Sequence, residues 1–346
     1  MVVVVVAAVL GSCGGPSSAG PGPSPTASSS TSATSLACKL PIYYPPATGD
    51  LEGGWVTFPG AQTQKDFNAV FRRSGNVLRS TAQPVLSGDG PIFYDRAKSR
   101  WVPVGKKAVA DDGANYAYMD LGNAQNTAHQ TLHLVEVATA HDRLITLPPL
   151  PAFQTWGVLE YTGGRIYLDQ VGFEGPGAPG LWWLDPATGQ VHQVVNDKTP
   201  VAIQGQAVWF ETVNAADAQA ITDQRNGTKL PDQLERRDLQ TGATLPWLYR
   251  PGSAVQLLGL DNAGHPFVAV SRGEATTDVM DLFVLTGPNA AGRIDQATVA
   301  EIDGLSVNFT DQHGTWFGGD RGISLYGDGA FRQVSSSGAR PAGRCA

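Results

Sequence analysis

Two aspartate–histidine pairs are the residues of this chain whose types and spacing could best support chemistry. Asp261-Asn262-Ala263-Gly264 and Asp311-Gln312-His313-Gly314 share the pattern D-x-x-G, 50 residues apart, and His265 directly follows the first copy. Histidines at matching positions of a repeat can contribute to a shared site. In a repeated fold, Asp261, His265, Asp311 and His313 would line one binding face. The alternative is a turn sequence copied with the repeat, in which Asp caps the backbone, and the sequence favours this alternative.

Other candidate residues give weaker signals. His129 and His133 have a spacing that suggests metal ligands on a helix, but His133 opens an expected strand and no third ligand lies nearby in the sequence. The sequence has no G-x-S-x-G, Walker, HExxH or EF-hand motif. Neither a catalytic residue nor a cofactor is therefore predicted. The sequence leaves open a calcium ion in a central channel, because the ligands of such an ion would come from distant segments and leave no local spacing pattern.

The elements that position these residues are short hairpins. In GLWWLDPATGQVHQV, Gly180 to Val194, an apolar run reaches Asp185-Pro186-Ala187-Thr188-Gly189, and an alternating run follows. Asp and Pro open tight turns, and Gly supplies a positive φ without steric cost. The stretch therefore predicts a strand, a turn and a return strand.

This hairpin recurs along the chain. Related turns lie near positions 95, 136, 185, 238, 286 and 327, so that successive turns are 41, 49, 53, 48 and 41 residues apart. Five of them follow a second hairpin, and those upstream hairpins cover residues 108–120, 157–169, 202–211, 258–270 and 306–318. Two hairpins per unit make a four-stranded antiparallel sheet. Six such sheets bury both their faces when they are arranged radially, so the predicted fold is an all-β, six-bladed β-propeller, with five to seven blades open.

Two stretches interrupt the repeat. In the first blade, residues 53–58 are expected to form an early strand and residues 92–104 the outer hairpin, which makes Gly60 to Gly90 an insertion. Thr212 to Gln233 is a second insertion, in the fourth blade. Loops on a rigid scaffold often carry binding specificity, but a tolerated surface insertion is an equal alternative.

The charge balance argues against nucleic acid as a partner. The formal net charge is −7 and the pI is about 5.3. Proteins that bind a duplex usually carry a basic stripe. Arg72-Arg73 and Lys106-Lys107 are too isolated to form one.

The N-terminus has the pattern of an export signal. Val2 to Leu10 is an apolar run of nine residues, too short to span a bilayer as a helix. The following Leu10-Gly11-Ser12-Cys13 resembles the lipobox of bacterial lipoproteins, although no Lys or Arg precedes the apolar run. The resemblance implies a signal peptide over residues 1–12 and a lipid on Cys13. Residues 13–36 would then form a Ser/Pro/Thr-rich tether and residues 37–346 the propeller. An ordinary secretory signal, with Cys13 incidental, is the alternative.

Two cysteines remain after Cys13, and they lie at the two ends of the folded region. Cys38 and Cys345 are expected to form a disulfide, as pairs in exported proteins usually do. The bond would bring the two ends of the propeller together where the ring closes.

Several blade segments resemble known propellers. AVADDGANYAY and GLWWLDPATGQVHQV are similar to WD-repeat and TolB-like blades. TDQHGTWFGGDRGISLYGDGAFRQV resembles the blades of sensor-type regulators. The chain as a whole resembles bacterial propeller lipoproteins. The resemblance implies the architecture of residues 38–345 and no particular reaction.

The leading functional hypothesis is a non-catalytic binding module. It would be a monomer, anchored outside the cytoplasm to the bacterial cell membrane through the lipid on Cys13, at the cell surface or in the periplasm. Its partner would be an envelope protein, peptide or glycan. The main alternative is a lactonase-like propeller hydrolase or lyase with a channel metal. A sensor domain is a third, weaker hypothesis.

Overall fold

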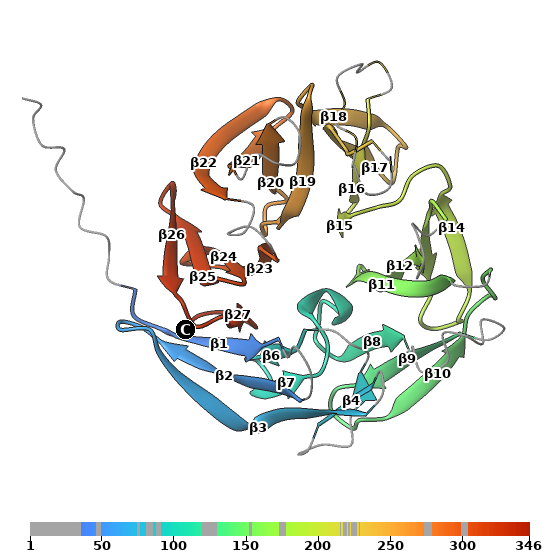
Figure 1. The fold of residues 1–346 in the computed structure, drawn as a ribbon. Coiled ribbons are helices and arrows are strands. Elements are labelled where there is room, and N and C mark those ends of the chain that lie inside the picture. Colours follow the sequence, from blue (N-terminus) through green and yellow to red (C-terminus); the bar gives the residue numbers. More distant parts are fainter. Residues whose placement is uncertain are drawn as a thin grey trace, which may run out of the picture. The chain divides into compact units, whose positions relative to one another are not determined.

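Six antiparallel sheets follow one another around a ring in the computed structural model (Figure 1). The residues that the structure describes are 36–45, 50–74, 77–80, 86–87, 91–119, 130–151, 154–172, 178–214, 216, 220, 222, 227, 229–272, 279–298 and 304–346. Over this part of the chain the only helix is the short 3-10 helix η1, Lys106–Ala108. The predicted all-β, six-bladed propeller is confirmed. The expected signal peptide and Cys13 lie outside the described residues.

The blades are the six sheets, taken in chain order. The first contains β27 (Arg340–Pro341), β1 (Lys39–Tyr44), β2 (Leu51–Thr57), β3 (Gln62–Ser74), β4 (Val77–Ser80) and β5 (Leu86–Ser87). The second contains β8 (Asn115–Met119), β9 (Thr131–Glu136) and β10 (Asp142–Thr146), and an isolated bridge joins Val109 to Tyr116 on its inner side. The third contains β11 (Gln154–Thr162), β12 (Arg165–Gly172), β13 (Leu181–Leu184) and β14 (Val191–Val195).

The last three blades are regular four-stranded meanders. The fourth contains β15 (Ala202–Gln204), β16 (Ala207–Thr212), β17 (Gln233–Asp238) and β18 (Thr244–Tyr249). The fifth contains β19 (Ser253–Leu260), β20 (Pro266–Arg272), β21 (Val279–Gly287) and β22 (Ala290–Thr298). The sixth contains β23 (Ser306–Asp311), β24 (Gly314–Gly319), β25 (Gly322–Gly327) and β26 (Ala330–Ser335).

The first blade differs from the prediction. Its strand β3 lies inside Gly60 to Gly90, the stretch interpreted as an insertion, and pairs with β2. The expected outer hairpin, residues 92–104, instead forms a separate two-stranded sheet of β6 (Phe93–Asp95) and β7 (Arg100–Val102). Both assignments were therefore wrong. The hairpin was recognised correctly, but the polar, charged sequence of β3 hid a strand that buries only Ala69 and Phe71 among its described side chains.

The β6–β7 hairpin packs between the first and second blades. Phe93 and Val102 join a core cluster with Tyr116 and Val135 of the second blade. Trp101 joins another with Leu51 of the first blade. The two faces of this hairpin therefore serve two different blades, which explains why it belongs to neither sheet.

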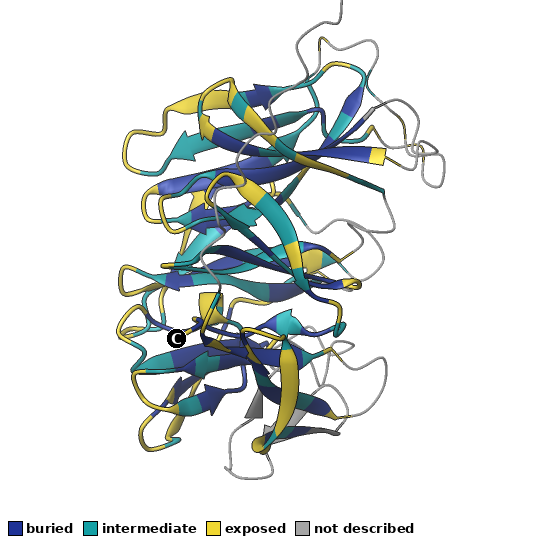
Figure 2. Ribbon diagram, turned by 90° about the vertical axis from the view of Figure 1, so that its left-hand side faces the viewer, coloured by how far each residue is buried: buried dark blue, intermediate teal, exposed yellow. Residues whose placement is uncertain are grey.

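Apolar clusters between neighbouring blades form the core. Leu132 and Leu168 share a cluster between the second and third blades, and Trp209 packs with Val268 between the fourth and fifth. The outer strands β10, β14, β18 and β22 are mostly exposed. Figure 2 shows buried residues concentrated within the sheets and exposed ones at the tight turns. Lateral packing of blades therefore supplies the burial that a single sheet lacks.

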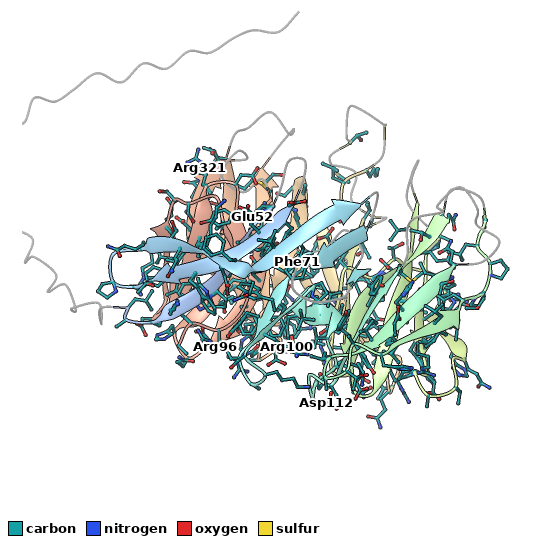
Figure 3. The ribbon with its side chains drawn as sticks, turned by 90° about the horizontal axis from the view of Figure 1, so that it is seen from below. Glu52, Phe71, Arg96, Arg100, Asp112 and Arg321 are labelled. Carbon is teal, nitrogen blue, oxygen red and sulfur yellow. A yellow bond between two sulfur atoms is a disulfide. The ribbon has the colours of Figure 1, made fainter. Side chains whose placement is uncertain are left out.

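In the regular blades, the first and third hairpin turns leave from the same end of the ring. In an antiparallel meander, the turn between the first and second strands and the turn between the third and fourth lie at the same end. We call this end the turn face. Asp112 lies there, while Arg321, between β24 and β25, lies at the opposite end (Figure 3).

Candidate functional site

The aspartates of the outer turns are used to hold those turns together. The Asp185 carboxylate accepts hydrogen bonds from the Ala187 N–H at 2.8 Å and the Thr188 hydroxyl at 3.0 Å. Asp238 accepts the same two kinds of bond from Thr241. These hydrogen bonds lower the pKa of both carboxyl groups. Gly189 and Gly242 adopt φ values of 76° and 73°, as the turn sequence requires.

The first aspartate–histidine pair is a self-contained turn. Asp261 Oδ1 accepts the N–H groups of Ala263 and His265, both at 2.8 Å. Its Oδ2 lies 3.0 Å from His265 Nδ1. The carboxylate therefore organises the loop between β19 and β20, and a binding role for Asp261 and His265 remains a prediction.

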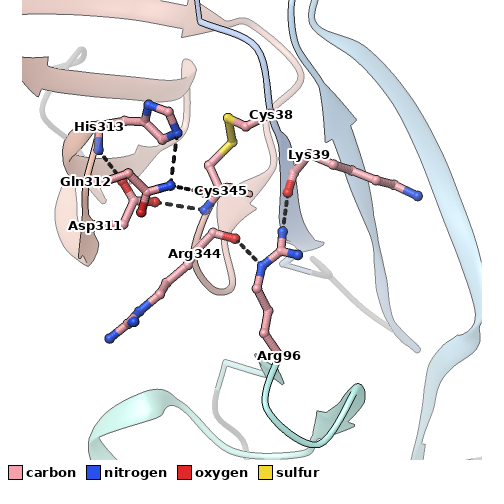
Figure 4. The surroundings of a disulfide bond; sticks show 8 residues. All are labelled: Cys38, Lys39, Arg96, Asp311, Gln312, His313, Arg344 and Cys345. Carbon is pink, nitrogen blue, oxygen red and sulfur yellow. Dashed lines mark hydrogen bonds between the residues drawn. A yellow bond between two sulfur atoms is a disulfide. The ribbon is translucent and has the colours of Figure 1, made fainter.

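The second pair lies where the ring closes (Figure 4). Asp311 Oδ1 accepts the His313 N–H at 2.9 Å, and Asp311 Oδ2 accepts the Cys345 N–H at 2.8 Å. Gln312 donates to the Cys345 carbonyl at 2.9 Å and lies 3.2 Å from His313 Nε2. The turn between β23 and β24 thus contacts the C-terminal segment directly. A binding role for Asp311 and His313 is likewise still a prediction.

The predicted disulfide between Cys38 and Cys345 is present, with the two Cα atoms 5.5 Å apart. Beside it, β27 pairs with β1, and the Lys39 N–H donates to the Ala346 carbonyl at 2.9 Å. Arg96, in the β6–β7 turn, donates to the carbonyls of Arg344 and Lys39 (Figure 4). We call this junction of the two ends of the propeller the seam.

Polar side chains connect the inner turns of successive blades. Gln204 donates to the Asn262 carbonyl at 3.0 Å, and Asn262 donates to the Thr310 carbonyl at 3.0 Å. Gln312 then links the sixth blade to the seam. The D-x-x-G repeat therefore positions neighbouring blades relative to one another, a role that the sequence pattern alone did not indicate.

Beside the seam, the turn face contains a cavity of about 240 Å³, which we call the seam cavity. It lies between the β6–β7 turn, the turn before β8, β23 and the C-terminal segment. Aromatic side chains of Phe93, Tyr94 and Phe309 line it together with three cationic residues, Arg96, Lys106 and Arg344, and three carboxylates, Asp95, Asp111 and Asp112. The rings of Phe93 and Phe309 stack with centroids 5.9 Å apart. Ligand-binding pockets commonly combine apolar walls with a few polar groups in this way.

A titratable carboxyl lies on a strand that packs against η1, whose Lys106 lines this cavity. Glu160 is on β11, the inner strand of the third blade, where the register with β12 shifts. Burial raises the pKa of Glu160 to about 7. The charges of Lys107 and Lys106 oppose this shift, and that of Asp111 adds to it. Because Lys106 and Asp111 also line the seam cavity, Glu160 belongs to the same electrostatic environment.

Replacement of Glu160 by Gln is expected to stabilise the protein at pH 8. The folded pKa lies above the ordinary value of 4.5. Between pH 4.5 and about pH 7 the folded state therefore binds more protons than the unfolded state, and the free energy of unfolding falls as pH rises. Glutamine removes this loss, a gain on the order of 1 kcal/mol. Urea unfolding at pH 5 and pH 8 measures it. The exposed Glu136→Gln is the control, and equal pH dependence in both variants would contradict the prediction.

Metal ligands do not cluster in the part of the chain that the structure describes. No group of three or more His, Cys, Asp or Glu side chains there is arranged to hold a metal ion. His133 pairs with Asp142 at 2.7 Å and stacks on Tyr118, while His129 lies outside the described residues. The sequence-based question of a calcium ion stays open. Among the described helices, none has the length and apolar character to cross a membrane.

Sequence reasoning missed the seam cavity. In the sequence, Lys106-Lys107 is only an isolated basic pair, and Glu160 lies in a strand segment that matches no functional motif. The hairpin pattern places Glu160 on an inner strand, which was the one available signal. Ring closure brings together the distant segments that line the cavity, which are residues 93–97, 106, 109–113, 309 and 344.

Comparisons with known proteins concern the fold alone. No protein-family model matches the chain, and no curated protein matches it. An oligogalacturonate lyase in complex with manganese has a TM-score of 0.46 at 10% identity, over 83% of this chain and 74% of that chain. Prolyl oligopeptidase B from Galerina marginata has a TM-score of 0.45 at 13% identity, over 89% and 42%. The oligogalacturonate lyase from Vibrio parahaemolyticus has 0.42 at 10% identity, over 83% and 89%. The propeller assignment rests on the strand pairing itself.

Proposed function

We propose that this protein is a non-catalytic binding module outside the cytoplasm, tethered to the membrane by a lipid on Cys13. The seam cavity is its binding site, and its partner is a protein, peptide or glycan of the cell envelope. The observation that carries the proposal is the cavity of about 240 Å³, with aromatic walls and charged groups on the rigid turn face. Recognition sites commonly combine such walls with a few convergent polar groups.

The proposed location has separate support. The Cys38–Cys345 disulfide is of a kind that persists in oxidising compartments. Leu10-Gly11-Ser12-Cys13 has the residue types of a lipoprotein cleavage site. Mass spectrometry of the membrane-bound protein tests the tether, because a diacylglyceryl group on Cys13 would identify it and an unmodified Cys13 would refute it.

Two matched alanines test the binding site. Ala97, which lines the cavity, and Ala187, in the third blade, are both exposed, and each donates its N–H to an aspartate two residues earlier, at 2.9 and 2.8 Å. Ala97→Trp should obstruct the cavity, while Ala187→Trp places the same bulk in an equivalent turn elsewhere.

The experiment screens the full chain, made in an oxidising compartment, against a random hexapeptide library and a panel of envelope glycans. Fluorescence anisotropy then measures the affinity of each hit for the wild type and both variants. We expect about a tenfold loss with Ala97→Trp, equivalent to about 1.4 kcal/mol, and no loss with Ala187→Trp. Hits that bind both variants equally, or a screen without hits, would overturn the proposal.

A further inference from the structure

We propose that the seam cavity receives an acidic side chain of a peptide segment, bound by Lys106 and Arg344, and that Glu160 competes with this side chain for the lysines of η1. The inference rests on the proposed function and specifies the class of ligand.

The cationic side chains that line the cavity differ in how many hydrogen bonds and ion pairs they already form. Arg96 donates to two backbone carbonyls of the seam. The Lys106 ammonium lies over the Phe93 ring, 5.8 Å from its centroid, and forms no ion pair with a described carboxylate. Arg344 is exposed, and its side chain extends away from the disulfide (Figure 4). Two cationic groups at the cavity are therefore available to an incoming ligand.

The carboxylates of the lining are already committed to local structure. Asp95 Oδ1 accepts the N–H groups of Ala97 and Lys98, at 2.9 and 3.3 Å. Asp111 Oδ2 accepts the Gly163 N–H at 2.8 Å and the Thr162 hydroxyl at 3.2 Å. Asp112 Oδ1 accepts the Ala114 N–H at 2.8 Å. Their charges are thus partly compensated by backbone donors, whereas no protein group in the described part of the chain accepts a hydrogen bond from the side chain of Lys106 or Arg344. A ligand carboxylate can therefore replace water at both cations, because it accepts charge-assisted hydrogen bonds, which are the strongest of this kind.

The size of the cavity favours one inserted side chain. Pockets for whole drug-sized ligands usually measure about 300 to 1,000 Å³, and the seam cavity measures about 240 Å³. A glutamate side chain has methylene groups that would contact Phe93 and Phe309, and a terminal carboxylate that would reach the cations. One anchoring side chain in a pocket is a common way to bind a peptide segment.

Glu160 supplies an internal competitor. Lys107 and Lys106 of η1 and Asp111 of the following turn are the charged groups that act on it. When Glu160 is neutral, the positive charges of both lysines attract a ligand carboxylate without opposition from Glu160. When Glu160 is ionised, its negative charge reduces that attraction. Since the ligand glutamate stays ionised from pH 6 to pH 8, binding should weaken as pH rises through about 7, where Glu160 ionises.

The test uses fluorescein-labelled hexapeptides with two central glutamates or two central glutamines, and a labelled glucuronate disaccharide. For the full chain at pH 6, we expect the glutamate peptide to bind about tenfold more tightly than the glutamine peptide. Lys106→Gln combined with Arg344→Gln should remove this preference. Arg165→Gln combined with Arg332→Gln, on β12 and β26, removes the same number of positive charges outside the cavity and should keep the preference. Wild-type affinity should fall about threefold from pH 6 to pH 8, and Glu160→Gln should abolish that fall.

Each other outcome overturns the inference. Equal affinity for the two peptides would exclude acidic recognition, and binding of the glucuronate probe alone would assign the cavity to an acidic sugar. A pH dependence that survives Glu160→Gln would remove Glu160 from the site. The proposed function fails separately: neutral hits that Ala97→Trp still blocks would preserve the binding site while refuting its acidic ligand.

Discussion

Replacing both Cys38 and Cys345 with alanine is expected to lower the free energy of unfolding by about 4 to 5 kcal/mol. The bond joins residues 307 positions apart in sequence. In the chain-entropy model, a cross-link across so long a loop removes much of the conformational freedom of the unfolded chain. Both cysteines are also buried, in one cluster with Leu40, Ile42 and Trp316. The variant therefore loses packing at the seam together with the covalent closure.

Urea denaturation with and without reductant measures this effect. Reductant should bring the wild type close to the variant and leave the variant unchanged. The backbone pairing of β27 with β1 does not need the sulfur atoms. Nor do the hydrogen bonds that the Cys345 backbone accepts from Gln312 and donates to Asp311. If the variant loses less than about 1 kcal/mol, these contacts alone close the ring.

Local sequence patterns predicted the hairpins well. The D-P-A-T-G and D-L-Q-T-G turns need an aspartate to accept backbone hydrogen bonds and a glycine at positive φ, and both needs are visible in the sequence. Asp185, Asp238 and Asp261 indeed cap their own turns. Cysteine placement likewise predicted the disulfide, because two cysteines remained at the two ends of the folded region.

Features that no local apolar pattern marks were missed. Strand β3 has few apolar residues, and its side chains from Gln62 to Lys65 are exposed, so that no alternation marked it as a strand. The β6–β7 hairpin carries an ordinary hairpin pattern, and only its burial on both faces explains its place between blades. The seam cavity was missed because it forms only when ring closure brings distant segments of the chain together.

Replacement of Trp209 by alanine is expected to cost about 4 kcal/mol of stability. Trp209, on β16, is 1% exposed and packs against Trp247 with ring centroids 4.8 Å apart. Its cluster also contains Val255 and Val268 of the next blade, so that truncation would open a cavity between two blades.

The size of this loss tests whether lateral packing of blades holds the ring together. Trp209→Phe is the matched variant: the indole Nε1 has no hydrogen-bond partner within the described structure, so phenylalanine keeps most of the apolar contact and loses no bond. We expect it to cost about 1 to 2 kcal/mol, and Leu245→Ala, at a side chain 47% exposed, to cost less than about 0.5 kcal/mol. In thermal and urea unfolding, Trp209→Ala should lose the most stability, Trp209→Phe less, and Leu245→Ala the least. If Trp209→Ala were as mild as Leu245→Ala, the interface between the fourth and fifth blades would contribute little, and the stability of the ring would rest on the sheets and the seam.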